Sequence, residues 1–299
     1  LTLGAGQTIR GAGNLLIGFG GMVNNGAIRQ QGTVALTIDP GTTDAGLGAN
    51  FINNGTLIAE GTGGINLNSG IYDNNTTIEA AVGSQVILNA GATIVGGNLT
   101  STGTGQIRSA VNGSTAPVLD GVTVTAGSNL VQNNQFDTVI RNGITNQGTW
   151  NLNGTTVTTN ITFDGSQTID GAGEIVMSNS GANRIVSGNA NVGTLTLGAS
   201  QTIRGAGQLL IDFGGMVNNG TIRQQGTAAL TIDPGNTDAG IGANFINNGT
   251  LIAEGTGGIV LKDGIYDNNT TIEAAVGSQV ILNAGATIVG GNLTSTGTG

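Results

Sequence analysis

The first 105 residues of this 299-residue chain occur twice, and no other feature of the sequence constrains its fold as strongly. Residues 1–105 return as residues 195–299 at a constant offset of 194 positions, with no gap and with 95 of 105 residues identical. A fixed long period is the mark of a repeat architecture, in which each unit packs against its neighbours. We therefore expect a repeat protein, of which this chain is a window of about one and a half units.

Ten positions differ between the two copies, and most of them exchange small polar residues or one aliphatic residue for another. With the first-copy residue written first, the differences are Gly6/Ser200, Asn14/Gln208, Gly18/Asp212, Ala27/Thr221, Val34/Ala228, Thr42/Asn236, Leu47/Ile241, Asn66/Val260, Asn68/Lys262 and Ser69/Asp263. This pattern indicates a constant core beneath a variable surface. Such a pattern favours a repeat that provides length and stiffness over a repeat that provides a binding site.

Shorter periods lie inside the 194-residue unit. Residues 51–57 (FINNGTL) are followed 21 positions later by residues 72–78 (YDNNTTI) and preceded 29 positions earlier by residues 22–28 (MVNNGAI). Residues 144–150 (ITNQGTW) are a looser copy. A unit of about 20 to 30 residues cannot bury its own apolar face, but it can do so when stacked on its neighbours.

Alternation of aliphatic with small or polar residues indicates short β-strands. It appears in residues 34–38, 65–67, 86–88, 122–125 and 150–152, and it is typical of strands with one buried face. Gly or Asn-Gly bounds nearly every such segment, and no segment of 11 residues or more has the apolar spacing of a helix.

These patterns predict an all-β fold, a parallel β-helix or β-solenoid with rungs of about 20 to 30 residues. We expect residues 1–299 to form one continuous solenoid, in which 106–194 are the unrepeated remainder of the period. Each rung would contribute two or three short strands to parallel sheets. The residues expected to fill the core are Ile38, Leu67, Ile78, Val86, Leu88, Val122, Val124 and Leu152.

Asparagine pairs recur at the same place before a strand, starting at Asn24, Asn53 and Asn74. In stacked parallel strands, such amides hydrogen-bond to their own kind in the next strand. We therefore predict ladders of Asn side chains along one corner of the solenoid. Glycine is expected at the other corners, since it adopts positive φ without a steric penalty.

Composition narrows the functional classes. Hydrophobic residues make up 37% of the chain, which argues against intrinsic disorder. The net charge of −9 disfavours nucleic acid as a partner, because no basic surface would displace counterions from phosphate. The chain has no Cys and no His, so disulfides and thiolate metal sites are ruled out. Its apolar runs fall short of the roughly 18 residues that a membrane-spanning helix needs.

Two equivalent loops carry the best candidates for metal ligands, Asp39 with Asp44 and Asp233 with Asp238. Oxygen-rich loops with two carboxylates suit Ca²⁺. The Asp-Pro-Gly sequence is equally ordinary turn chemistry, and the ligand spacing of known calcium loops is absent. Calcium binding by these loops stays open, and we assign no metal-binding or cofactor-binding residue.

Four glutamates are the candidates for acid–base catalysis: Glu60, Glu79, Glu254 and Glu273. Paired acids of this kind serve glycosidases, and β-helix folds host polysaccharide lyases. Here each acid is duplicated with the repeat, Lys262 is the single lysine, and no acid cluster is visible in the sequence. The chain therefore has few side chains that are suited to general acid–base catalysis. We therefore predict no catalytic residue and no enzyme activity.

Asn-x-Ser/Thr sequences would accept glycans if the chain is exported. They include those that begin at Asn54, Asn75, Asn98, Asn112, Asn153 and Asn160. Such matches arise by chance in a chain so rich in Asn and Thr, so we leave them unassigned.

The Asn-Gly-Thr-Leu phrase at Asn54, the Gly-rich corners, the lack of Cys and the long repeat resemble bacterial secreted β-helix proteins. These include filamentous haemagglutinin-like adhesins, autotransporter passengers and giant repetitive surface proteins. The resemblance extends over the whole chain, but it lies in the general character of the sequence and not in a diagnostic motif. It implies a right-handed parallel β-helix, export to the cell surface, and a role in adhesion or in a biofilm matrix. It supplies no matched site residue.

The leading functional hypothesis is a structural one: a stiff segment of an extracellular or cell-surface stalk or filament. Its partners would be neighbouring repeats or identical subunits stacked end to end. A solenoid that binds glycans or a host surface is the alternative, and a lyase-like β-helix enzyme is the third. The unrepeated region holds Phe136, Trp150 and Phe163 but no acid cluster in sequence, which disfavours the enzyme and leaves binding open.

Overall fold

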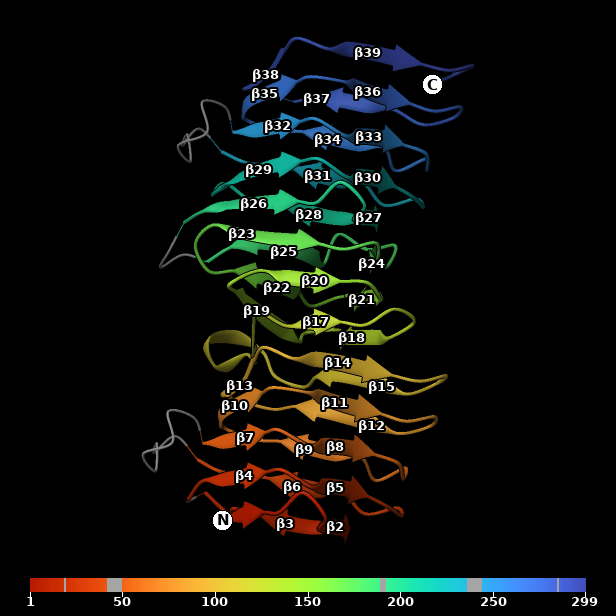
Figure 1. Cartoon of the computed structure of the whole chain (residues 1–299). Helices are drawn as coiled ribbons and strands as arrows, with labels where there is room; N and C mark the ends of the chain where they lie inside the picture. The colour runs from red at the N-terminus through yellow and green to blue at the C-terminus, as the bar shows by residue number, and fades with distance from the viewer. Residues whose placement is uncertain (19, 42–49, 189–191, 236–243, 284) are drawn as a thin grey trace. The chain divides into compact units, whose positions relative to one another are not determined.

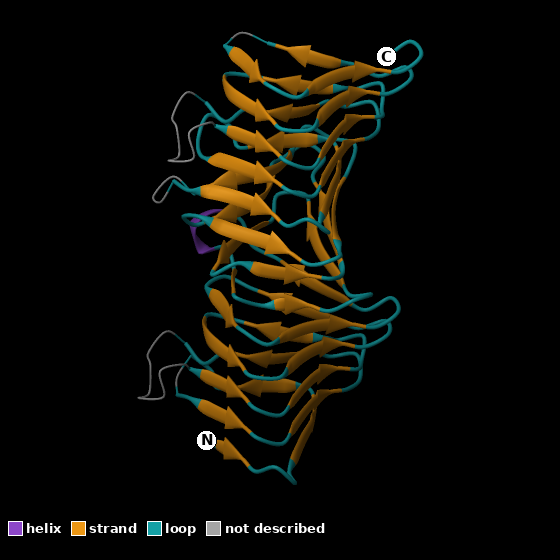
Figure 2. Ribbon diagram, turned by 45° about the horizontal axis from the view of Figure 1, so that its top comes forward, coloured by secondary structure: helices purple, strands orange, loops and turns teal. Residues whose placement is uncertain are grey.

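The computed structural model of the chain describes residues 1–18, 20–41, 50–188, 192–235, 244–283 and 285–299. These residues form an all-β solenoid of about 12 turns built from three parallel sheets, which confirms the predicted fold class. Figure 2 shows them almost entirely as strands and loops, with one short 3₁₀ helix, η1 (Gly113–Thr115).

The chain divides into two compact units. The first comprises Leu1–Gln132, Phe136–Val139 and Gln147–Thr149, and the second comprises Asn133–Gln135, Ile140–Asn146 and Trp150–Gly299. The single continuous solenoid expected over 1–299 stays a prediction.

In the first unit each turn of the chain adds one strand to each of three parallel sheets. One sheet contains, in spatial order, β1 (Thr2–Leu3), β4 (Met22–Asn24), β7 (Phe51–Asn53), β10 (Gly70–Asn74), β13 (Ala92–Val95) and β16 (Val118–Asp120). The next contains β2 (Thr8–Gly11), β5 (Ala27–Gln30), β8 (Thr56–Ala59), β11 (Thr77–Ala80), β14 (Asn98–Ser101) and β17 (Thr123–Val124). The third contains β3 (Gly13–Leu15), β6 (Leu36–Ile38), β9 (Ile65–Leu67), β12 (Gln85–Leu88), β15 (Gln106–Ser109) and β18 (Asn129–Asn133). In Figure 1, β4, β7 and β10 lie one above another.

The second unit repeats this arrangement. One sheet contains β22 (Thr159–Phe163), β25 (Asn183–Ser187), β28 (Gly207–Leu209), β31 (Leu230–Ile232), β34 (Ile259–Leu261) and β37 (Val280–Leu282). The next contains β20 (Ile144–Asn146), β23 (Gln167–Asp170), β26 (Thr194–Leu197), β29 (Gly215–Asn218), β32 (Phe245–Asn247), β35 (Gly264–Asn268) and β38 (Ala286–Val289). The third contains β24 (Glu174–Met177), β27 (Thr202–Gly205), β30 (Thr221–Gln224), β33 (Thr250–Ala253), β36 (Thr271–Ala274) and β39 (Asn292–Ser295). The residues of β19 (Asp137–Arg141) and β21 (Thr149–Asn153) are divided between the units, and the last residue of β18, Asn133, belongs to the second unit.

Strand pairing gives the length of a turn directly. Ala27 of β5 pairs with Thr56 of β8, and Thr56 pairs with Thr77 of β11, so successive turns span 29 and 21 residues. These are the spacings found in the sequence, and the rungs of about 20 to 30 residues are confirmed. Turns of different length stay in register because the extra residues are placed in the loops between strands.

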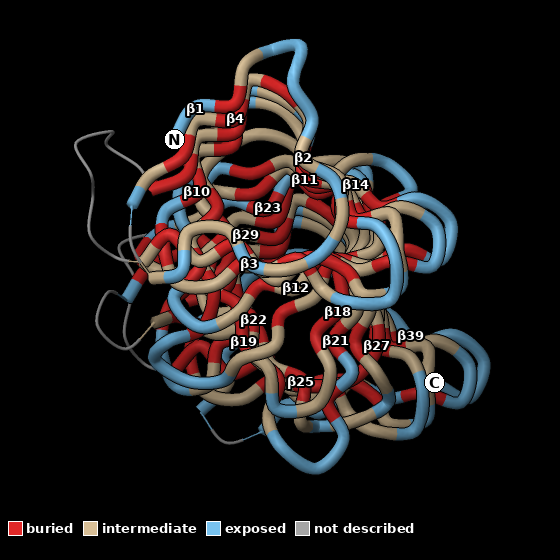
Figure 3. The backbone as a smooth tube through the Cα atoms, turned by 90° about the horizontal axis from the view of Figure 1, so that it is seen from below, coloured by how far each residue is buried: buried red, intermediate tan, exposed pale blue. Residues whose placement is uncertain are grey.

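The core is a stack of aliphatic side chains that point inward from all three sheets. All eight residues predicted for it are buried, with exposed fractions of 0 to 2%. In β11, buried Ile78 and Ala80 alternate with half-buried Thr77 and Glu79, and Figure 3 shows the same alternation along many strands. Fully burying one such aliphatic side chain contributes about 1.5–3 kcal/mol.

The predicted strands are present, but two are shorter than expected. β17 covers only Thr123–Val124 of the predicted 122–125. Alternation predicts a strand over 34–38, whereas β6 begins at Leu36 and Val34 is 65% exposed. The side-chain amide of Gln30 donates a hydrogen bond to the carbonyl oxygen of Val34 at 2.8 Å. That bond holds Val34 in the turn, where the strand ladder does not reach it.

The Asn ladders are confirmed in both copies. The amide nitrogen of Asn24 donates to the side-chain oxygen of Asn53 at 2.8 Å, and that of Asn53 donates to Asn74 at 2.9 Å, all three being buried. A second, exposed ladder joins Asn25, Asn54 and Asn75 with amide hydrogen bonds of 2.9 Å. The buried ladder satisfies polar groups that would otherwise be costly inside the fold.

Candidate functional site

Glu60 and Glu254 lie in equivalent surface ion pairs. Glu60 follows β8, where the Gln31 amide donates to it at 2.9 Å and the Arg29 guanidinium also contacts it. These two hydrogen bonds lower the pKa of Glu60. Glu254 pairs with Arg223 at 3.1 Å in the second copy. The Glu60 carboxylate is therefore held as an anion, the opposite of what a general acid requires.

Glu79 and Glu273 each line a shallow, open hollow. The hollow at Glu79 holds about 470 Å³, and the equivalent hollow at Glu273 holds about 460 Å³. Among the described residues that line them, each hollow has a single carboxylate beside Asn and Thr side chains. Glycoside hydrolysis uses two carboxylates across the bond, and neither hollow pairs two.

The two Asp-Pro-Gly loops differ between the copies. Asp44 and Asp238 lie outside the described residues, so the proposed two-carboxylate loops stay untested. Asp39 follows β6 and is half-buried. Its equivalent, Asp233, follows β31 and is only 4% exposed, and its Oδ2 accepts a hydrogen bond from the Lys262 ammonium at 2.5 Å.

Asp233 belongs to a cluster of three carboxylates that the sequence did not reveal. Asp212 follows β28 and Asp263 comes just after β34, so the three acids lie one turn apart beside three neighbouring strands. One carboxylate oxygen of each lies within 4.8 Å of those of the other two. The expectation that the chain has no acid cluster is therefore wrong for the second copy.

The signal for this cluster was present among the ten differences between the copies. Three of them introduce charge: Gly18/Asp212, Asn68/Lys262 and Ser69/Asp263. Their separations in sequence conceal that they lie together, because the turns that join β28, β31 and β34 span 23 and 29 residues and match no constant period. The three substituted residues are themselves exposed or half-buried, as expected for a variable surface, but they surround a buried carboxylate, Asp233.

The carboxylates around Lys262 stabilise its positive charge. Its hydrogen bond to Asp233, together with the nearby charges of Asp212 and Asp263, raises the pKa of the Lys262 ammonium. The Tyr266 hydroxyl donates to the carbonyl oxygens of Ile232 and Lys262 at 2.8 and 2.5 Å. Burial, and then the charge of Asp233, raises the pKa of Tyr266. The tyrosine is therefore a neutral structural donor beside the cluster.

Aromatic side chains are mostly inside the fold. Trp150 and Phe163 are fully buried, and Phe51 packs against Tyr72 with ring centroids 5.7 Å apart. Among the described aromatic residues, Phe213 is the one large exposed side chain, at 49%. In the unrepeated region, Trp150 and Phe163 thus contribute to the core and offer no platform for a sugar ring, whereas Phe136 is half-buried.

Two Asn-x-Thr sequences lie within the exposed Asn ladder. The amide nitrogen of Asn54 donates to Asn25, and that of Asn75 donates to Asn54. A glycan is attached through this same nitrogen, so modification at either residue would compete with the ladder. Asn112 and Asn153 are exposed, and Asn98 and Asn160 are half-buried.

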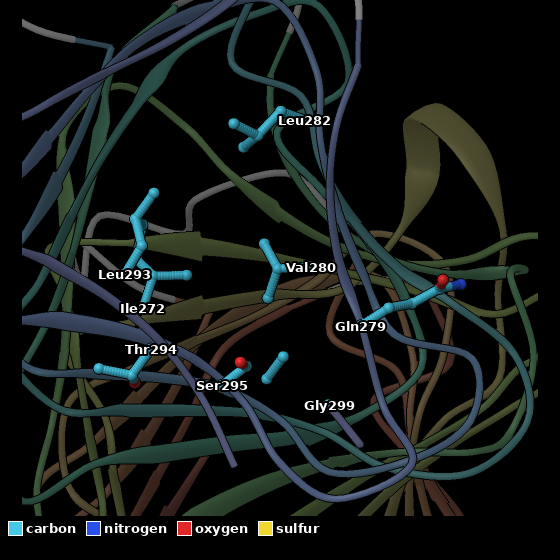
Figure 4. A pocket seen from close by; sticks show the side chains of 9 residues that line it. Ile272, Gln279, Val280, Leu282, Leu293, Thr294, Ser295 and Gly299 are labelled. Carbon is cyan, nitrogen blue, oxygen red and sulfur yellow. The ribbon is translucent and has the colours of Figure 1, made fainter. Parts of the chain in front are cut away.

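An apolar cavity lies beside the core side chains of β36, β37 and β39. It holds about 340 Å³ and is lined by Ile272, Val280, Leu282 and Leu293 among others (Figure 4). Leu282 and Leu293 are 51% and 59% exposed, whereas Leu88 and Leu99, their counterparts in the first copy, are 2% and 0% exposed. The cavity is an uncovered turn of core, not a shaped ligand pocket.

No protein-family model matches the chain, and no curated protein and no solved structure is detectably similar to it. Within the described residues, no helix is long and apolar enough to cross a membrane.

Proposed function

We propose that this chain is a stiff spacer, a structural segment of an extracellular or cell-surface stalk or filament. Within each unit, every turn pairs with the next in parallel and in register, so adding a turn adds length and leaves the cross-section unchanged. Near-identity of the two copies suits a mechanical role, because each copy then does the same work.

The observation that carries the proposal is the set of hydrogen-bond ladders along the stacking direction. Backbone ladders run through three sheets, and the buried Asn ladder adds side-chain bonds of 2.8 and 2.9 Å between turns. Bending or stretching the stack would have to break many such bonds together. Each buried bond that is broken and left unmade costs about 1–3 kcal/mol.

The proposed partners are further repeats or identical subunits stacked end to end. The parallel, in-register pairing of successive turns supports this, since a further layer of strands can continue the same ladders. Secretion, adhesion and a biofilm matrix remain part of the proposal through the resemblance to bacterial surface β-helix proteins.

Glycan binding is the alternative function, and one observation favours it. The hollows at Glu79 and Glu273 repeat at equivalent positions and are lined by the Asn and Thr side chains that hydrogen-bond sugars. The burial of Trp150 and Phe163 counts against it, because sugar sites commonly stack the ring on an aromatic side chain. Oligosaccharide titration monitored by amide chemical shifts would reveal contact at both hollows.

The spacer role is tested by adding one 194-residue unit and comparing small-angle X-ray scattering of the two proteins. One unit of about eight turns at about 4.8 Å per turn should lengthen the particle by about 40 Å. The cross-sectional radius of gyration should stay the same. An added unit that widens the particle, or that leaves its maximum dimension unchanged, would contradict the spacer role.

A further inference from the structure

The second copy of the repeat differs from the first at one place where charge has accumulated. All three substitutions that introduce charge, at Asp212, Lys262 and Asp263, lie around Asp233. In the first copy the corresponding residues are Gly18, Asn68 and Ser69, around Asp39. The cluster is therefore specific to the second copy, and the first copy is a natural control within the same chain.

Adjacent strands hold the cluster in place. The backbone nitrogen of Asp212 donates to the carbonyl oxygen of Asp233 at 2.8 Å, and that of Lys262 donates to Ile232 at 3.0 Å. Register between β28, β31 and β34 pairs Leu209 with Ile232 and Ile232 with Leu261. The three carboxylates thus follow the ends of three paired strands, with one oxygen of each within 4.8 Å of the others.

Asp233 provides the independent sign of a ligand. Its side chain is 6% exposed, and its Oδ1 is buried without a hydrogen-bond partner among the described residues. Lys262 contacts only the other oxygen, Oδ2. An ionised oxygen left unsatisfied inside a fold is costly, and the Asp233 carboxylate that carries this oxygen belongs to the cluster of three acids. A cation bound to Oδ1 would remove that cost.

Charge and size determine which cation fits. Three carboxylates and one ammonium leave two negative charges, which a divalent cation balances. Ca²⁺ binds carboxylate oxygens at about 2.3–2.6 Å, so ligands on opposite sides of the ion lie up to about 5 Å apart. Separations within 4.8 Å meet this limit. Mg²⁺ requires shorter distances, near-ideal octahedral geometry and several retained waters, which a partly buried cluster satisfies less well.

We propose that Asp212, Asp233 and Asp263 form a Ca²⁺ site that is present in the second copy of the repeat and absent from the first. Asp233 supplies its buried Oδ1, the other two carboxylates complete the protein ligands, and Lys262 neutralises the remaining oxygen. Bound Ca²⁺ would join three successive turns of the second unit. The proposal does not depend on the spacer function.

Calorimetric titration of the chain with CaCl₂ tests the site. We expect one ion per chain with a dissociation constant of about 0.1–1 mM, as in extracellular calcium modules, and binding at least ten-fold weaker for MgCl₂. Tb³⁺ is a second probe, because Tyr266 lies beside the cluster and should sensitise its luminescence. An absence of Ca²⁺ binding up to several millimolar, or tighter binding of Mg²⁺, would overturn the assignment.

The first copy provides the control variants. Asp212→Gly with Asp263→Ser restores first-copy residues, which the same fold already accepts, and should weaken Ca²⁺ binding at least ten-fold with an unchanged circular dichroism spectrum. Lys262→Asn should strengthen binding several-fold, because it removes a competing positive charge. Unchanged affinity in the double variant would place the ion elsewhere and refute the site.

A gain-of-site variant completes the test. Gly18→Asp, Asn68→Lys and Ser69→Asp together transfer the cluster to the first copy, and the calorimetric stoichiometry should rise from one Ca²⁺ to two. A stoichiometry that stays at one in a correctly folded triple variant would show that these residues are insufficient, contrary to the proposal.

Discussion

At the scale of single residues, the distinguishing feature of this protein is what its buried amides do. Asn53 donates to Asn74 at 2.9 Å and to the carbonyl oxygen of Thr77 at 3.1 Å, and it accepts from Asn24 at 2.8 Å. Its exposed neighbour Asn54 makes similar amide bonds in contact with water. The same residue type thus serves two ladders with different energetic weight.

Asn53→Ala should therefore destabilise the fold by about 2–3 kcal/mol, since it leaves buried polar groups of Asn24 and Asn74 without their partner. Asn54→Ala should cost less than about 0.5 kcal/mol, because water replaces the lost bonds. Urea denaturation of the two variants measures both. Equal losses would show that burial of the inner ladder carries no energetic weight.

Ion pairs contribute little to the stability of the fold, but they make that stability depend on pH in a defined way. Arg204 donates two hydrogen bonds to Glu174, at 2.7 and 3.1 Å, and these lower the pKa of Glu174 below its ordinary value of 4.5. A depressed carboxylate pKa stabilises the fold above pH 4.5, and this contribution is lost as the pH falls through the folded-state pKa.

Glu174→Gln should thus lower the free energy of unfolding by about 0.5 kcal/mol at neutral pH, because the pair is partly exposed and screened. The difference from the unmodified protein should disappear at a pH below the folded-state pKa of Glu174. Urea denaturation at the two pH values measures it. A difference that persists at the lower pH would mean that the Glu174 carboxylate contributes by packing.

At the scale of elements, glycine determines how closely one turn can approach the next. Gly97, which links β13 to β14, has a φ of +63°, and a Cβ there would lie 2.0 Å from the carbonyl oxygen of Asn74. Gly6, in a corner of the first turn, has open space around its Cα, and the second copy carries Ser200 in its place. Only the first of these glycines is a steric necessity.

Gly97→Ala should destabilise the protein by about 2–3 kcal/mol through backbone strain and the clash with the preceding turn. Gly6→Ala should change stability by less than about 0.5 kcal/mol. Thermal unfolding of both variants makes the comparison. A harmless Gly97→Ala would indicate that the corner relaxes and that turn spacing is not limited by glycine.

At the scale of the whole molecule, stability depends on each turn covering the one before it. Leu88 and Leu99 are covered by the chain that follows residue 105, and Leu282 and Leu293 are the same residues without that cover. Because contacts run between neighbouring turns, an added turn should stabilise mainly the turn that it touches.

Appending a copy of residues 106–132 after Gly299 should therefore bury Leu282 and Leu293, raise the melting temperature, and reduce binding of an apolar dye. Burying one leucine side chain is worth about 1.5–3 kcal/mol before the entropy of the added turn is subtracted. The same extension with its counterpart of Ile107 changed to Asp is the control. Equal melting temperatures with and without the extension would contradict this account.

The sequence by itself determined the architecture, because the long repeat, the short repeats and the alternation within strands all indicate the same fold. Alternation assigned inward residues such as Ile78 and Leu152, the spacings of 21 and 29 residues gave the turn lengths, and the recurring Asn pairs located the ladders. Each of these follows from local periodicity, which can be recognised directly in the linear sequence.

Only the tertiary structure decided which substituted positions lie close together in space. Asp212, Asp233 and Asp263 are separated in sequence by 21 and 30 positions, unequal intervals that match no constant period. They converge because loops of different length return the chain to the same edge of the sheet formed by β28, β31 and β34. Likewise, whether Leu293 is core or surface depends on the turn that covers it. Such contacts between turns are set by packing in three dimensions, which the order of residues alone does not contain.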